Sequence, residues 1–395
     1  MYGADIRLPG MKFAAIARPP VVFGKVKTYD AAKALAVAGV EQVVELPAAE
    51  APSMFKAQGG VAVIASNSWA ALRARDLLDI EWDDGSNADY DSDSYKQVLL
   101  QAVRQPGSVL RQQGDVDQAL ETAEQTLEAE YYAPHLAHAS MEPPAAVASV
   151  TADFCEVWAP TQNPQSLIPM VEAATGLTKE KVKINVTLLG GAFGRKSKCD
   201  FAEEAVVLSK MTGAPVLVQW SREDDIRHDY FHSVSAQQLA ASIGPDGAVT
   251  GWRHRLAYPS IMSTFDPAVK APVAFEAGLG ALNVPYDIEN LTIEAGEAEP
   301  KVRIGWLRSV CNIFQSFGVN SFSDEIAHAR GLDPKDNLLE LLGPDRSLDF
   351  TDVGLEATEN YPFETGRLRS VIELVTDKAG WGRSVPEGHG LGIAA

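Results

Sequence analysis

Alternating apolar and polar residues mark several short stretches of this chain, and each stretch predicts a half-buried β-strand. The clearest runs over residues 182–188, directly before a glycine-rich turn. A helical pattern follows the turn, with an apolar face from Phe201 to Leu208. Asp200, with Glu203 three residues later, predicts an acidic variant of the capping box at the start of that helix. Gly213 predicts its end.

The same reasoning predicts a succession of short strands and helices along the whole chain. Strands are predicted at 12–17, 42–45, 61–65, 128–132, 155–159 and 216–220, and helices at 30–37, 68–78 and 321–330. A further helix is predicted after the polar turn 161–164 and ends near Gly176. A hairpin is predicted over 233–257, and residues 388–395 are predicted to begin a strand. The acidic stretch 83–93 is polar and poor in apolar residues, which is typical of a linker.

Composition and charge exclude several classes of function. The 395 residues suffice for two or three domains, and the formal net charge of −19 argues against binding nucleic acid or an anionic membrane surface. No stretch approaches the roughly 18 consecutive apolar residues of a membrane-spanning helix, and no signal peptide is visible. The compartment, cytoplasm or periplasm, therefore stays open. Three scattered cysteines show no metal-binding spacing, and we expect them to be buried thiols.

The turn Gly190-Gly191-Ala192-Phe193-Gly194-Arg195-Lys196 is the most informative stretch. A glycine turn between strand and helix lets backbone N–H groups converge on an anion. Arg195, Lys196 and Lys198 add three cations to a strongly acidic chain, which suggests a phosphate-bearing ligand. The spacing fits neither a Walker A loop nor the Rossmann motif. The alternative is a surface turn with solvated lysines.

Other polar groups have weaker signals. Glu142 either faces a substrate channel or is a structural carboxylate bonded to backbone N–H groups. His135 and His138 have a spacing that suits a metal but lack a third ligand nearby. His228 and His232 are expected to be a solvated pair, and the charged residues 222–229 a salt-bridged surface or subunit contact.

Several motifs in order resemble the molybdenum-binding subunit of the xanthine dehydrogenase and aldehyde oxidase family. The resemblance is strongest to isoquinoline 1-oxidoreductase beta subunits. It is carried by Met141-Glu142-Pro143-Pro144, Trp158 through Asn163, Gly190 through Lys196, Arg222 through Asp229, Gly305-Trp306-Leu307-Arg308-Ser309 and, near the N-terminus, residues 2–11. Together these matches cover nearly the whole chain.

The resemblance implies an α+β fold, in which an α/β hammerhead domain precedes part of a molybdopterin-binding domain of mixed sheets and helices. It places the hammerhead at 1–90, a linker at 91–113 and the first part of the cofactor domain at 114–395. It implies a molybdopterin cofactor, of the cytosine dinucleotide form usual in bacterial relatives, with an oxo–sulfido molybdenum centre and no direct protein ligand to the metal. Such enzymes hydroxylate an N-heterocycle or an aldehyde with oxygen from water.

Site residues follow from the resemblance by position. Gln162 would donate a hydrogen bond to an oxo ligand of molybdenum, a task suited to a neutral amide. Gly191, Ala192, Phe193 and Gly194 would line the metal face and the pterin with their backbone groups, and Arg195 belongs to the same cofactor-binding turn. Arg308 would contact the pterin or a phosphate. The ring of Phe193 would both anchor the turn and shape the substrate pocket.

The chain also departs from the family pattern. Ala192 replaces the third glycine, which is tolerable if its φ is negative. Arg195 follows the isoquinoline-type branch instead of the more usual glycine. The glutamate that deprotonates the molybdenum-bound water or hydroxide lies in a Gly-rich motif that nothing here matches. The chain therefore resembles a piece of a larger subunit, and alone it should not turn over.

Three hypotheses remain. The first is the molybdenum-cofactor-binding portion of a molybdenum hydroxylase, with four kinds of partner: a small subunit with two [2Fe-2S] clusters, a second chain supplying the remaining cofactor-domain segments, a cytochrome c subunit, and a small-molecule substrate. The second is a non-catalytic remnant or assembly subunit that keeps the fold without cofactor. The third, an unrelated phosphate-binding protein, ranks last because Gln162, the turn and Arg308 would then occur in family order by chance.

Overall fold

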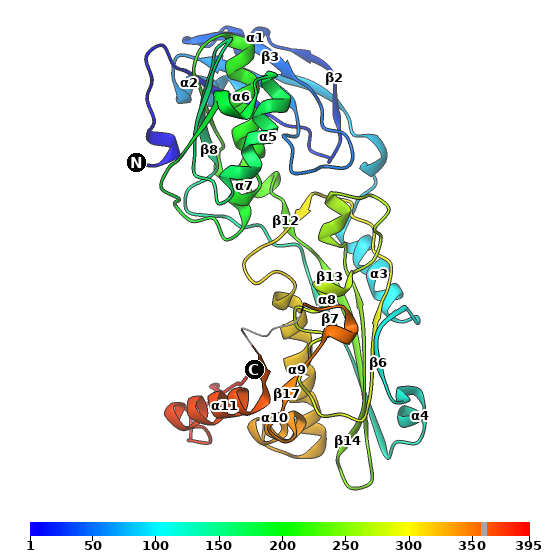
Figure 1. Ribbon diagram of the computed structural model, residues 1–395. Helices are drawn as coiled ribbons and strands as arrows, with labels where there is room; N and C mark the ends of the chain where they lie inside the picture. Colours follow the sequence, from blue (N-terminus) through cyan, green and yellow to red (C-terminus); the bar gives the residue numbers. More distant parts are fainter. Residues whose placement is uncertain (357–361) are drawn as a thin grey trace.

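The computed structural model describes residues 1–356 and 362–395. Figure 1 shows an elongated molecule with two lobes, each built on its own β-sheet. The N-terminus lies on the upper lobe, and the C-terminus lies near helices of the lower one. In the described part of the chain, no helix is long and apolar enough to cross a membrane. The mixed α and β content agrees with the predicted fold class.

The upper lobe contains a seven-stranded sheet formed by two separate parts of the chain. In spatial order its strands are β10 (Val182–Val186), β9 (Cys155–Ala159), β8 (Ala145–Val150), β11 (Val216–Gln219), β1 (Lys12–Ala17), β4 (Gly60–Ala65) and β3 (Val40–Leu46). Strand β1 pairs in parallel with β11 on one side and antiparallel with β4 on the other. The N-terminal segment and residues 145–219 therefore form one sheet.

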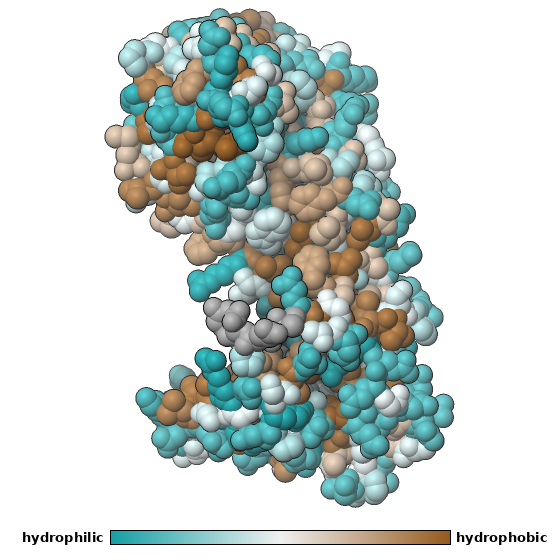
Figure 2. Space-filling view, in the orientation of Figure 1, coloured by the Kyte–Doolittle hydropathy of each residue, from teal (hydrophilic) through white to brown (hydrophobic). Residues whose placement is uncertain are grey.

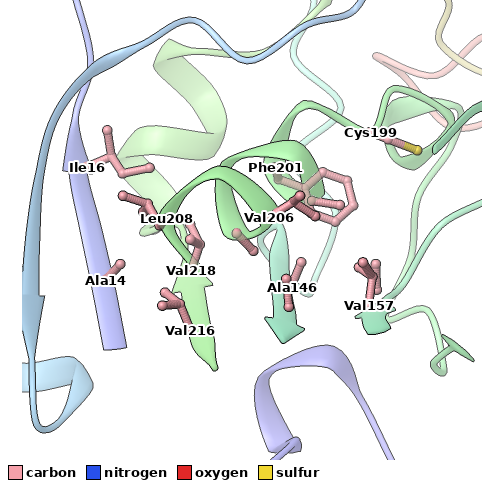
Figure 3. Close-up of a cluster of buried hydrophobic side chains, with 14 of the residues drawn as sticks. Ala14, Ile16, Ala146, Val157, Cys199, Phe201, Val206, Leu208, Val216 and Val218 are labelled. Carbon is pink, nitrogen blue, oxygen red and sulfur yellow. The ribbon is translucent and has the colours of Figure 1, made fainter. Parts of the chain in front are cut away.

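A hydrophobic core fills the space between this sheet and helices α5 (Pro164–Thr175) and α6 (Asp200–Thr212). The alternation along β1 directs Ala14 and Ile16 to this core and Ala15 to the opposite face, which packs against α2 (Ser68–Arg75). Helix α6 lies across the strands, and Phe201 near its start is fully buried (Figure 3). This packing fixes the position of the segment that enters α6.

The lower lobe contains a five-stranded sheet. Its strands are, in spatial order, β6 (Ser108–Gln113), β15 (Asn290–Ala295), β14 (Val249–Ala257), β13 (Ser235–Ile243) and β7 (Gln125–Ala133). Three two-stranded pairs complete the set: β2 (Lys25–Asp30) with β5 (Asp79–Asp83), β12 (Phe231–His232) with β16 (Ile304–Gly305), and β17 (Ser347–Leu348) with β18 (Phe363–Glu364).

The helices of the described residues are α1 (Ala32–Leu35), α2 (Ser68–Arg75), α3 (Ser92–Val103), α4 (Val116–Glu121), α5 (Pro164–Thr175), α6 (Asp200–Thr212), α7 (Arg222–Arg227), α8 (Ala274–Ala277), α9 (Asn312–Arg330), α10 (Pro334–Leu342) and α11 (Thr365–Ala379). Most of them pack against the two sheets, whereas α10 and α11 pack against other helices. Figure 2 shows that the surface is hollowed between the upper lobe and the end of the lower lobe. Apolar side chains gather on the upper lobe in this view.

Most predicted elements are present, with boundaries that differ by a few residues. The strands over 12–17, 61–65, 155–159 and 182–188, the 233–257 hairpin and the glycine ends at Gly176, Gly213 and Gly331 are confirmed. The expected strand at the C-terminus is wrong, because residues 390–395 have no regular structure. Residues 91–113 are not an irregular linker either, since they contain α3 and the edge strand β6.

The capping box predicted at Asp200 is wrong as well. Cys199 is the N-cap residue, and its side chain makes no capping hydrogen bond. Asp200 instead turns its carboxylate to two buried arginines. Glu203 accepts a hydrogen bond from the backbone N–H of Ala57, at 2.6 Å. Both acidic residues therefore join α6 to other segments instead of closing its first turn.

We expect the substitution Phe201→Ala to destabilise the upper lobe by about 3–5 kcal/mol, because it opens a cavity in a fully buried site. The control is Met211→Ala on the same helix, where the side chain is 48% exposed and should cost little. Urea unfolding followed by circular dichroism measures both. Equal losses for the two variants would contradict this assignment of the core.

Candidate functional site

The glycine turn joins β10 to α6 and has a backbone that few sequences can adopt. Gly191, Phe193 and Gly194 have φ angles of +89°, +54° and +105°. A Cβ atom on Gly190 would lie 2.5 Å from the Cβ of Glu142, and one on Gly194 would lie 2.4 Å from the carbonyl oxygen of Trp306. Glycine is therefore required at both positions by close approach of other segments. Ala192 is not among the residues with positive φ, so its methyl group is tolerated.

Gln162 lies against this turn and is held by it. Its side-chain Oε1 accepts a hydrogen bond from the backbone N–H of Gly194, at 3.1 Å. Its backbone N–H donates to the carbonyl oxygen of Lys196, at 2.9 Å. The N–H of Gly194 can only bond to an acceptor, which assigns the amide orientation of Gln162. The Nε2 group of this exposed side chain then has no hydrogen-bond partner among the described residues.

Arg308 reaches the same turn from the lower lobe. Its backbone N–H donates to the carbonyl oxygen of Phe193, at 2.8 Å. The next two residues, Ser309 and Val310, have φ angles of +73° and +48°, so this loop is strained beside the site. The side chain of Arg308 is exposed, and the ring of Phe193 is 48% exposed. Gln162, Phe193 and Arg308 therefore converge on one accessible patch.

The three cations of the turn do not face this patch. Arg195 is fully buried and pairs with Asp200, at 2.8 and 2.9 Å, and with Asp229, at 2.9 Å. Burial opposes its charge, but the carboxylates of Asp200 and Asp229 outweigh burial and raise the pKa of Arg195. The guanidinium also lies 5.2 Å from the ring of Trp220. The predicted role of this side chain in holding phosphate is not supported by its position.

Both lysines are buried too, so the alternative of a solvated surface turn is wrong. The Nζ atom of Lys196 donates to Glu142 Oε2, at 2.6 Å. The Nζ atom of Lys198 donates to the carbonyl oxygens of Gly194 and Trp306, at 2.8 and 2.9 Å. Burial, together with the charge of Arg195, holds the pKa of Lys198 well below its usual value. The three basic side chains therefore stabilise the turn from its buried side.

A buried network extends this bracing to two more segments. His138 bonds through Nδ1 to Asp229 Oδ2, at 2.8 Å, and through Nε2 to the carbonyl oxygen of Trp306, at 2.9 Å. Arg303 adds a second cation on Asp200, at 3.2 Å, and bonds to the carbonyl oxygen of His228. Residues 138–142, 161–163, 190–200, 222–229 and 303–310 are thereby tied together.

Glu142 has the structural role that the sequence left open. Besides binding Lys196, its Oε2 accepts from the backbone N–H of Gly190, at 3.0 Å. Its own backbone N–H donates to the carbonyl oxygen of Gly190, at 2.9 Å. The Met-Glu-Pro-Pro segment therefore clamps the first glycine of the turn.

The histidine and charged-motif expectations need correction. His138 and His135 do not form a metal site, because His138 bonds to Asp229 and the Nδ1 atom of His135 accepts from the N–H of Val234, at 3.2 Å. Residues 1–356 and 362–395 contain no cluster of three metal-ligating side chains. His232 is buried and not solvated. Segment 222–229 is only partly a surface, because Asp225 and Asp229 are fully buried whereas Glu223, Ile226 and Arg227 are exposed.

A pocket of about 380 Å³ adjoins the turn. Ser197, Asn163 and Trp306 bring it next to the site, and the remaining walls come from α5, α6, residues 54–56 and Phe265. Glu203 is its acidic wall residue. Burial, reinforced by the charges of Asp200 and Glu204, raises the pKa of Glu203 to about 7.

Sequence reasoning misses several residues of this arrangement. It gives no individual role to Asp229 or Arg303, it treats His138 only as a metal ligand, and it treats Glu203 only as a cap. The signal available is a density of acidic residues at 222–229 and 200–204, next to the cationic turn. Most of the salt-bridge partners of these acidic residues lie in other segments of the chain, so the folded structure is needed to identify them.

Comparison with known proteins gives a family for this site. The family model described as Molybdopterin cofactor-binding domain matches residues 102–337. A nicotinate dehydrogenase subunit of Pseudomonas putida is 29% identical over 367 residues, which are 91% of this chain and 31% of that protein. The beta subunit of isoquinoline 1-oxidoreductase from Brevundimonas diminuta is 27% identical over 357 residues, 85% of this chain and 43% of that protein.

The fold also resembles a solved structure. Quinoline 2-oxidoreductase from Pseudomonas putida 86 superposes with a TM-score of 0.70 at 18% identity, over 96% of this chain and 52% of that one. The chain thus spans between about a third and a half of the length of these relatives.

We expect Arg195→Ala to destabilise the protein by about 3–5 kcal/mol, because it leaves Asp200 and Asp229 buried beside an unfilled cationic position. Arg308→Ala, which removes an exposed guanidinium from the same site, should change stability by less than about 0.5 kcal/mol. Chemical denaturation measures both. Similar stability of the two variants would argue against the bracing role of Arg195.

The stability of the folded protein should depend on pH because Glu203 has a raised pKa. Its pKa is about 7 in the folded protein and 4.5 ordinarily, so the folded state holds the proton more tightly and stability falls as pH rises from 4.5 to 7. Glu203→Gln keeps an acceptor for the N–H of Ala57 but cannot ionise. We expect this variant to be more stable than the wild type at pH 8, by about 1–2 kcal/mol, and not at pH 4.5.

Thermal melts at the two pH values measure the effect. Glu180→Gln is the control, because this exposed carboxyl has a pKa lowered by its hydrogen bond to Thr178. It should gain no stability at pH 8. A Glu203→Gln variant without a pH-dependent gain would show that the carboxyl ionises freely in the folded protein.

Proposed function

The chain belongs to the molybdopterin cofactor-binding family, and on that basis we propose that it forms the cofactor-binding portion of a molybdenum hydroxylase. One observation carries this proposal: five of the six segments that resemble the family, although far apart in sequence, are tied together at the glycine turn. They present Gln162, Phe193 and Arg308 on one accessible patch.

The residues of this patch fit a molybdopterin cofactor. The turn exposes backbone where glycine leaves no side chain, and Gln162 offers a neutral donor whose orientation is set by Gly194. Arg308 is a cation available to an anionic or pterin acceptor. Gly191, Ala192, Phe193 and Gly194 would hold the group through main-chain contacts.

In this proposal the side chain of Arg195 does not contact the cofactor. Instead, this side chain holds the turn from below by pairing with Asp200 and Asp229. Cofactor binding by the turn then depends on backbone N–H groups and on Arg308. A phosphate would be held by dipoles and one exposed cation rather than by a cluster of lysines.

When bound, the cofactor supplies the two-electron acceptor for hydroxylation of carbon, with water as the oxygen source. Gln162 orients an oxygen acceptor through Nε2, and Phe193 contributes an exposed ring beside it. The substrate, an N-heterocycle or an aldehyde, occupies the pocket bounded by Ser197 and Trp306. A carboxylate from a segment corresponding to the rest of the relatives' length would act as the general base.

The proposed function also implies partner proteins. The relatives named above are subunits, which favours an assembly of several chains. We propose a small [2Fe-2S] protein as electron acceptor, a chain or segment completing the cofactor domain, a cytochrome c that receives the electrons next, and the cytosine dinucleotide form of the cofactor. A non-catalytic protein with the same fold is the rival that the following measurement separates.

The test is the molybdenum content of the protein purified from its native host with its co-purifying partners. Elemental mass spectrometry should find close to one molybdenum per chain. Arg308→Ala should lower this ratio at least several-fold, because it removes the exposed cation of the patch. Arg73→Ala, an exposed arginine on α2, should leave it unchanged. Absence of molybdenum from wild-type protein grown with molybdate would establish the non-catalytic alternative.

A further inference from the structure

The pocket beside the turn has walls suited to a flat aromatic molecule. Phe55 stands edge-on to Phe265, with ring centroids 5.2 Å apart, and edge-on to Trp306, at 5.1 Å. Phe55 also has a φ angle of +60°, and Met54 before it has +47°, so strained backbone holds this wall in place. A volume of about 380 Å³ lies in the range of small-molecule sites.

One side of this aromatic pocket carries a carboxyl group, that of Glu203, which forms no salt bridge among the described residues. The exposed ammonium of Lys56, another wall residue, acts on it only through its charge and partly offsets the rise in the pKa of Glu203. Glu203 accepts only the backbone N–H of Ala57 among the hydrogen bonds of the described residues, and no ion pair there includes it. Its acidic neighbours differ, because Asp200 pairs with Arg195 and Arg303, and Glu204 pairs with Arg18 at 2.6 Å. The acceptor capacity of Glu203 is therefore left for a molecule in the pocket.

We propose that Glu203 is a specificity-determining residue that selects planar heteroaromatic ligands bearing an N–H donor. The aromatic walls contact the ring system of the ligand, and the carboxylate of Glu203 accepts a hydrogen bond from a ring N–H or an exocyclic N–H of the ligand. A carbonyl compound without a donor gains only the apolar contacts and faces an unpaired carboxylate, which disfavours it. The inference rests on the proposed function, since it narrows the substrate class from heterocycles and aldehydes to donor-bearing heterocycles.

The pocket that contains Glu203 adjoins the glycine turn, which is the proposed cofactor-binding segment. Ser197, a wall residue, donates its hydroxyl hydrogen to the carbonyl oxygen of Gly194, at 2.6 Å. Another wall residue, Trp306, accepts a hydrogen bond from Lys198 through its carbonyl oxygen. A ligand in the pocket therefore lies against the same segments that present Gln162.

The experiment compares two bicyclic probes of nearly equal shape, isoquinolin-1(2H)-one, which has a ring N–H, and isochromen-1-one, which has a ring oxygen instead. Calorimetric titration of the full chain at pH 8 should show about tenfold tighter binding of the lactam, the usual gain from a charge-assisted hydrogen bond. Glu203→Gln should reduce the preference to within about threefold. Lowering the pH to 5.5 should weaken it in the wild type only.

Phe265→Leu is the matched control. It removes an aromatic wall, so it should weaken both probes by similar factors and leave the preference intact. Circular dichroism and melting curves verify that each variant is folded. Equal affinity of the two probes for wild-type protein, a preference that persists in Glu203→Gln, or binding of neither probe would each overturn the inference.

The outcome is separable from that of the proposed function, because the titration needs no molybdenum. Molybdenum in the native protein without a lactam preference would leave the cofactor function standing and remove the role of Glu203. A preference that depends on Glu203, in a protein that carries no molybdenum, would keep the recognition site and remove the hydroxylase.

Discussion

The pairing of Arg195 with Asp200 and Asp229 is the interaction on which the site depends. All three side chains are buried, so each charge is costly unless its partners remain in place. The pair of carboxylates comes from α6 and from the segment after α7, and His138 and Arg303 join the same carboxylates from two other segments. Local movement of any one segment would leave a buried charge uncompensated. The strained turn and the strained 309–310 loop are therefore held in a single arrangement.

In this arrangement most charged side chains of the site are buried, and few of its accessible groups are charged. The lysines and the arginine lie behind the turn, where carboxylates and carbonyl oxygens accept their hydrogen bonds. The accessible face offers backbone dipoles, the amide of Gln162 and the guanidinium of Arg308. Such a face discriminates between ligands by the position of its donors more than by overall charge, and it does so in a chain whose net charge is strongly negative.

The sequence predicts local structure well and tertiary pairing poorly. Period-two alternation and glycine ends identify β1, β4, β9 and β10 and the ends of α5, α6 and α9, because these signals act within one segment. The family pattern predicts which motifs belong to the site. Neither signal shows that Lys196 and Lys198 are buried, since their partners lie in distant segments. The linker expected at 91–113 is instead largely regular structure, because α3 is amphipathic and buries Tyr95, Leu99 and Val103.

The composite upper sheet has a consequence for how the chain acquires its structure during synthesis. Lys12 of β1 pairs with Val216 of β11, about two hundred residues later, while the lower-lobe segments β6 and β7 lie between them in sequence. Contacts so distant along the chain slow folding, because the loop must close before they contribute. Until β11 leaves the ribosome, one side of β1 has no neighbouring strand and can associate with other chains. Chaperone binding to nascent chains should therefore be concentrated before about residue 216 has emerged.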